Sequence, residues 1–204
     1  MLKIIHWIKN HKNIAATLAF ITLLGVGLAL AMFKQLQDVE SRSWETLAVG
    51  QYLSMSDKSA EAHEQFRNLQ SNYQRSKVAD FAYIYDAAVY AREGKWQAAL
   101  DNYQKVLHRD RTTQVLALAQ IGAAKMQEAL NNLDEAQKAY LEFQEKYPDH
   151  FAAPEAYEGL ARIGAVRGQW DKAKENLERL RVLYPDTNWG HRAEMRLKGL
   201  MGTK

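Results

Sequence analysis

Hydrophobic and polar residues alternate differently in two parts of this chain. Residues 14–33, IAATLAFITLLGVGLALAMF, form a run without a single charged side chain. A helix of that length rises roughly 30 Å at ~1.5 Å per residue, which matches the hydrocarbon core of a membrane. Beyond residue 34, apolar residues recur every three or four positions among charged ones, a pattern typical of packed amphipathic helices. We therefore expect an all-α protein with one N-terminal transmembrane helix at 14–33.

The second part of the chain repeats with a step of 37 residues. An alanine marks the same place in each copy: Ala62, Ala99, Ala136 and Ala173. Large apolar residues follow four and seven positions later: Phe66, Tyr103, Tyr140 and Leu177, then Leu69, Val106, Phe143 and Leu180. Small residues stand twelve positions before the alanines: Gly50, Ala87, Ala124 and Ala161. This spacing predicts one apolar face of a helix, with a small residue that lets a neighbouring helix approach closely.

A turn separates two helical patterns within each copy. Gly94 and Gly168 mark two of these turns, and Asp57 and Asn131 take the glycine's place in the others. Each copy is thus a helix–turn–helix hairpin, and a series of such hairpins predicts a solenoid.

These features resemble the tetratricopeptide repeat (TPR) family over residues 43–187. The resemblance implies an α-solenoid of about four hairpins, at 43–76, 80–113, 117–150 and 154–187. The fourth unit matches best, through Gly168, Trp170, Ala173, Leu180 and Pro185. Two departures leave the helix register of units two and three open. Asp86 stands where a leucine-like residue is expected, and Gly122 lies two residues early.

The segments on either side of the repeats complete the expected domain order. Residues 188–204 carry apolar residues at helical spacing between arginines and lysines, which predicts a capping helix and a short tail. Residues 34–42 contain neither glycine nor proline, so we expect a helical connector between the span and the first unit. Residues 1–13 form a basic tail.

Charge predicts the direction of the span. Lys3, Lys9 and Lys12 precede it, which places the tail in the cytoplasm and the repeats in the periplasm of a bacterial inner membrane. An alternative is a signal peptide cleaved after Ala31, since Ala29-Leu30-Ala31 fits the small-residue pattern. The chain contains no cysteine, which excludes a lipoprotein. Its formal charge of +3 arises from the tail, so the repeats carry no excess that would favour nucleic acid.

Motifs for catalysis or metal binding are missing from the sequence. It has no HExxH, GxSxG or phosphate-binding glycine loop, and we interpret His63 as an exposed helical histidine. We expect no enzyme activity, cofactor, metal or small-molecule substrate.

The family resemblance implies instead a groove that binds proteins, lined by the first helix of each hairpin. In our register the groove positions are Leu47, Gln51, Ile84, Ala88, Ile121, Lys125, Glu158 and Arg162. The basic clamp that some members use for chaperone tails is absent at these positions. An alternative is that Leu47, Ile84 and Ile121 pack between adjacent hairpins. Within the span, Gly25 and Ala29 form a small-xxx-small pair suited to helix contact in the membrane.

The layout of tail, span and repeats is similar to the YfgM-like ancillary subunits of the Sec translocon. That resemblance implies a scaffold touching membrane lipid, with translocon subunits, a periplasmic chaperone or a prolyl isomerase as partners. Two alternatives stay open. One is an envelope-assembly or cell-division adaptor of the Tol-Pal type with a cleaved signal peptide. The other is an accessory subunit of a different membrane complex.

Overall fold

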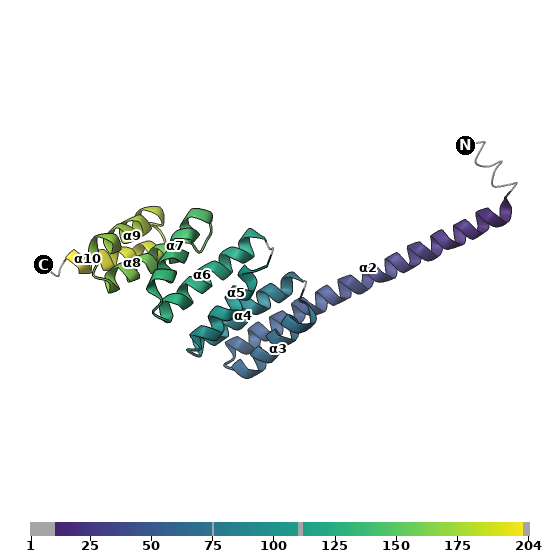
Figure 1. The fold of residues 1–204 in the computed structure, drawn as a ribbon, viewed down its shortest axis with the longest axis horizontal. Helices are drawn as coiled ribbons and strands as arrows, with labels where there is room; N and C mark the ends of the chain where they lie inside the picture. Colours follow the sequence, from purple (N-terminus) through teal and green to yellow (C-terminus); the bar gives the residue numbers. More distant parts are fainter. Residues whose placement is uncertain (1–10, 75, 110–111, 202–204) are drawn as a thin grey trace. The chain divides into compact units, whose positions relative to one another are not determined.

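The computed structural model describes residues 11–74, 76–109 and 112–201, and helices are the only regular elements in these ranges. The expectation of an all-α solenoid with one long apolar N-terminal helix is confirmed. Figure 1 shows the order of the helices. Their bounds are α2 Lys12–Met55, α3 Ser59–Asn72, α4 Lys77–Arg92, α5 Trp96–Leu107, α6 Thr113–Ala129, α7 Leu133–Lys146, α8 Ala153–Val166, α9 Trp170–Leu183 and α10 Asn188–Met201. Lys3, Lys9 and most of the predicted tail lie outside the described residues.

The chain divides into two compact units, residues 1–45 and 46–204. The described part of the first unit is the N-terminal portion of α2, whose apolar side chains are exposed. Thr17 keeps its hydroxyl within the helix by donating to the carbonyl of Asn13 at 2.9 Å. Between Phe20 and Met55, α2 is long and apolar enough to cross a membrane by length and composition, with a best window of mean hydropathy 1.5.

In the second unit, each helix packs against the next. Neighbours in sequence are in contact from α3 through α10. The helices α4, α6 and α8 also touch one another directly, so they line one side of the repeat unit. The helix α10 packs against α9 and closes the C-terminal end, as the sequence predicts for a cap.

The alanines of the 37-residue pattern lie in the core. Ala62, Ala99, Ala136 and Ala173 are buried, and the large apolar residues four positions later are buried with them. Four clusters of such residues follow one another along the unit, each joining elements of neighbouring hairpins. Sequence periodicity and packing therefore agree.

Gly122 lies two residues before the small-residue position of Ala124, and it occupies a second repeat position that it shares with Gly159. A Cβ atom on Gly122 would overlap the Tyr103 ring of α5, and one on Gly159 would overlap the Tyr140 ring of α7 in the same way. The two glycines are 37 residues apart. Both positions therefore need a bare backbone because the aromatic ring of the preceding hairpin lies directly against it.

The predicted turns share one backbone conformation. Asp57, Gly94, Asn131 and Gly168 have positive φ angles of 60°, 74°, 63° and 67°. This left-handed region is costly for residues with a Cβ, although aspartate and asparagine tolerate it better than most. The turn signal in the sequence thus reflects a backbone requirement at every hairpin.

We expect Gly168→Ala to lower the free energy of unfolding by about 1–2 kcal/mol. The cost would come from the backbone alone, because a Cβ at Gly168 would meet nothing within 4 Å. Urea unfolding of the full chain in detergent, followed by circular dichroism, measures it. Asn131→Gly is the matched control and should be neutral or stabilising. A Gly168→Ala protein as stable as the original would show that the turn does not need positive φ.

Candidate functional site

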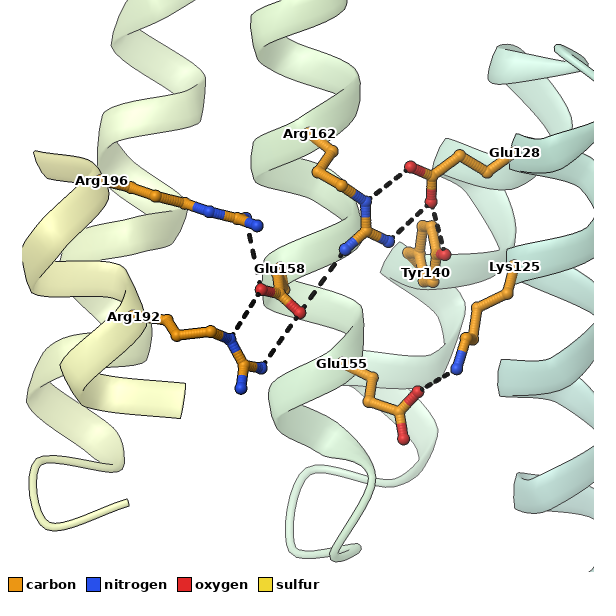
Figure 2. A network of polar contacts seen from close by, with 8 residues as sticks. All are labelled: Lys125, Glu128, Tyr140, Glu155, Glu158, Arg162, Arg192 and Arg196. Atoms are coloured by element: carbon orange, nitrogen blue, oxygen red, sulfur yellow. Dashed lines mark hydrogen bonds and ion pairs between the residues drawn. The ribbon is translucent and has the colours of Figure 1, made fainter. Parts of the chain in front are cut away.

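A cluster of charged side chains lies on α6, α8 and α10, on the side of the unit that the even-numbered helices line (Figure 2). We call it the charged face. Its members are Lys125 and Glu128 from α6, Glu155, Glu158 and Arg162 from α8, and Arg192 and Arg196 from α10, with Tyr140 of α7 beneath. Residues three, four or seven positions apart share one face of a helix, which is why α8 contributes three of them.

The tightest contact of the charged face joins Arg162 to Glu128. The Arg162 Nε donates to Glu128 Oε1 at 2.7 Å and a terminal nitrogen donates to Oε2 at 2.8 Å. The Tyr140 hydroxyl also donates to Oε2 at 2.8 Å. A guanidinium bound to a carboxylate through two parallel hydrogen bonds is among the strong polar contacts in proteins. It fixes the first helices of two adjacent hairpins to each other.

The electrostatics of this contact keep both partners charged. Burial raises the pKa of the Glu128 carboxyl, but the hydrogen bonds from Arg162 and Tyr140 outweigh it and leave the pKa below its ordinary value. The hydrogen bond to Glu128 likewise raises the pKa of Arg162. Burial raises the pKa of the Tyr140 hydroxyl, so it remains a donor at neutral pH. The pair is therefore ionised at neutral pH.

Glu158 is held more loosely, although it is buried. Arg192 approaches its two oxygens at 3.4 and 3.5 Å, and Arg196 approaches one at 3.3 Å. Both arginine side chains are partly exposed. Guanidinium groups held by long contacts at an accessible surface can turn toward carboxylates of another protein.

A pocket of about 290 Å³ lies next to Arg196. Its wall is largely apolar, from α8, α9 and α10, and includes Leu177 and Leu200. Arg162 and Arg196 also line it. The arrangement suits an apolar side chain that is followed or preceded by an acidic group.

Three of the eight predicted groove residues meet in the charged face: Lys125, Glu158 and Arg162. Lys125 pairs with Glu155 at 2.7 Å. Gln51 and Ala88 are half-buried on α2 and α4, at the equivalent repeat positions, and take no part in the cluster.

Leu47, Ile84 and Ile121 have little exposed surface. They are buried in the hydrophobic clusters, where neighbouring helices cover them. The structure therefore favours the alternative that these three side chains pack between hairpins. In the first unit, Gly25 and Ala29 are exposed, and a Cβ on Gly25 would meet nothing within 4 Å. Their role as a membrane contact stays a prediction.

Sequence reasoning missed four charged site residues: Glu128, Glu155, Arg192 and Arg196. Glu128 has Ala91 and Ala165 at the equivalent repeat positions, so the repeat gives no signal for it. The two arginines were noted only as the polar side of the cap. Their spacing of four residues on α10 was the available signal, since it places both on one face.

The sequence analysis interpreted His63 as an exposed histidine, and this interpretation is wrong. It is buried between α3 and α4, where its Nδ1 is hydrogen-bonded to Asp86 and its ring stacks on Tyr90 with centroids 4.1 Å apart. Asn102 and Gln70 also donate to the Asp86 carboxylate, at 2.9 and 3.1 Å. Asp86 can stand where an apolar residue is expected because these donors satisfy its carboxylate. This cluster is a structural polar core.

Within the residues that the structure describes, no three histidine, aspartate or glutamate side chains lie close enough to hold a metal ion. The series of helical hairpins, each packed on the next, defines a helical-repeat protein of the TPR class.

The comparison with protein families gives the same result. The model of the tetratricopeptide repeat-like domain matches residues 5–159, and that of the tetratricopeptide repeat matches residues 155–187. The first match covers more than half of the chain, so the protein belongs to the tetratricopeptide repeat-like domain family. Folds of this family are typically non-enzymatic scaffolds for protein–protein interaction.

Solved structures show the same fold. A tetratricopeptide repeat protein from Parabacteroides merdae is 14% identical with a TM-score of 0.62, over 78% of this chain and 60% of that one. Nearly identical TPR-like repeats from Podosopora anserina are 20% identical with a TM-score of 0.62, over 78% and 85% of the two chains. At these identities the likeness shows the fold alone. No curated protein sequence matches the chain.

We expect Glu128→Gln to lower the free energy of unfolding at pH 7 by about 1–3 kcal/mol, because it weakens a charged hydrogen-bonded pair. The folded pKa of Glu128 lies below the unfolded value of about 4.3. Its contribution is therefore complete above that value and is lost as the pH falls through the folded pKa. The difference between the two proteins should shrink in acid.

Urea unfolding of the full chain in detergent at pH 7 and in the acid range tests this expectation. Glu142→Gln is the control, since Glu142 pairs with Lys146 at 3.6 Å on an exposed surface. Its effect should stay within about 0.5 kcal/mol. An equal loss for both variants at pH 7 would argue against a special role for Glu128.

Proposed function

We propose that this protein is a single-span scaffold of the bacterial inner membrane, with its repeats in the periplasm. There it would dock chaperones or nascent secreted proteins at the Sec translocon. The observation that carries the proposal is α2, in which an apolar segment continues without a break into the first repeat helix. The proposal keeps a cytoplasmic tail at 1–13, a span at 14–33, a connector at 34–42, repeats at 43–187 and a cap at 188–204.

The lysines before the span support the orientation, because positive residues favour the cytoplasmic side. The resemblance in layout to the YfgM-like subunits supports the choice of partners. A helix that is both anchor and repeat element favours partners that work at the membrane, such as translocon subunits or a membrane-bound prolyl isomerase.

The charged face supports a role in binding proteins. Four cationic groups and three carboxylates meet there, which leaves an excess of one positive charge. Arg192 and Arg196 are accessible and reach Glu158 only through long contacts, Arg192 also lies over the Trp189 ring at 4.3 Å, and the pocket beside Arg196 is mostly apolar. Such a surface suits an acidic segment that also carries an apolar side chain.

A second candidate is an envelope-assembly or cell-division adaptor of the Tol-Pal type. Two Tyr-Pro-Asp turns, at 147–149 and 184–186, favour it, and it requires cleavage after Ala31. In a third, the protein is an accessory subunit of another membrane complex that docks through Gly25 and Ala29. The amino terminus of the mature protein and the behaviour of span variants separate these candidates.

The predicted topology can be tested with single cysteines, because the chain has none of its own. In cells with a permeabilised outer membrane, we expect an impermeant maleimide to label Met195→Cys, an exposed site on α10. Lys3→Cys should react only after the inner membrane is lysed. The reverse pattern would contradict a periplasmic repeat unit. Loss of residues 1–31 from the mature protein would support the cleaved alternative.

The partners can be tested by tagging the C-terminus and identifying proteins that co-purify in mild detergent. We expect translocon subunits or periplasmic folding factors, and at least a tenfold loss of them with Arg192→Glu and Arg196→Glu together. Lys174→Glu, an exposed change on α9, is the control and should retain them. Absence of every Sec component and folding factor would contradict the proposal. Loss of partners only with Gly25→Leu and Ala29→Leu would favour docking through the span.

A further inference from the structure

The first hairpin has an apolar surface on α2 that no described helix covers. Its members are Ala48, Val49 and Tyr52, and we call it the open edge. Val49 is 47% exposed and Tyr52 is 70% exposed, with Ala48 also exposed beside them. All three belong to the repeat unit and lie within one turn of the helix.

The equivalent positions in the later hairpins are buried. Val89, Met126 and Ile163 stand 37, 74 and 111 residues after Tyr52 and are 1%, 7% and 2% exposed. The positions equivalent to Val49 are buried in the same way: Asp86, Ala123 and Leu160. The open edge is therefore built like an internal interface of the solenoid.

The helix that covers these positions is always the second helix of the preceding hairpin. It is α3 on α4, α5 on α6 and α7 on α8. Each covering helix packs an aromatic ring against the residue that is equivalent to Ala48. Phe66 stacks on Tyr85 with centroids 6.4 Å apart, and Tyr103 and Tyr140 lie directly against Gly122 and Gly159. Three examples thus define the shape and chemistry of the missing neighbour.

The other end of the solenoid is finished differently. The helix α10 covers α9 and presents mostly polar residues to solvent, including His191, Glu194 and Lys198. Solenoids need a polar outer face at their ends to remain soluble. On α10 the positions equivalent to Val49 and Tyr52, which are Leu197 and Leu200, are buried and half-buried, so only α2 leaves this interface open. The open edge therefore indicates an interaction site rather than a general property of the repeats.

We propose that the open edge binds an amphipathic helix of a partner protein, antiparallel to α2, with a bulky apolar side chain over Ala48. Helices that are consecutive in the chain and joined by short turns pack antiparallel, so the internal examples fix this direction. A second copy that pairs through the same edge does not meet the requirement. Two copies anchored in one membrane through α2, as the proposed function has it, would bring their α2 helices together in parallel.

The test uses a helix that the protein already places at this kind of surface. The probe is a fluorescent, covalently stapled helical peptide of residues 131–147, which contains α7, and the target is the full chain in detergent. We expect saturable binding by anisotropy. Val49→Lys should weaken it at least tenfold, and so should Tyr140→Ala in the peptide. Val182→Lys, an exposed change on α9, should leave it unchanged.

A single-cysteine protein, Tyr52→Cys, tests the alternative occupant in the membrane. We expect no disulfide-linked dimer on mild oxidation. A disulfide-linked dimer would assign the edge to a second copy and would overturn the proposal. Two results of the peptide experiment would also overturn it: no binding of the peptide to the original protein, or equal binding to the Val49→Lys protein. The arginine variants of the charged face should bind the peptide normally, so failure of the proposed function and failure of this inference give different results.

Discussion

The contact between an aromatic ring and the bare backbone of a glycine organises the junctions between hairpins two and three and between hairpins three and four. Tyr103 and Tyr140 each lie against a glycine on the next helix, which brings consecutive hairpins close enough to bury a continuous core. Close-packed interiors tolerate little change in volume, so this contact sets the spacing of the hairpins. The buried alanines and the accessible charged face depend on that spacing, because side chains 34 residues apart can then meet.

Much of the architecture could be predicted from periodicity. The 37-residue step identified the buried alanines, the large residues that follow them and the four turn positions. Prediction from periodicity failed where a residue is required by its contact with a side chain of another hairpin. Gly122 seemed out of register because it contacts the Tyr103 ring of α5, and the sequence around Gly122 gives no sign of that contact.

Polar residues were the hardest to place. His63 and Asp86 satisfy each other in the interior, although each looks out of place when considered alone. Only part of the charged face was predicted, since Glu128 and the arginines of α10 break the repeat instead of following it. Residues that depart from a repeat carry its individual function, yet a single sequence gives no reason to group them.

The bidentate pair of Arg162 and Glu128 affects local unfolding of the repeats. In a linear array of repeats, each hairpin is stabilised by itself and by its immediate neighbours, and local opening can begin at any weak junction. The pair ties α6 to α8, so we expect the third and fourth hairpins to open together. Arg162 belongs to this pair and also lines the apolar pocket, so this part of the pocket is preformed and a partner would lose less entropy on binding there.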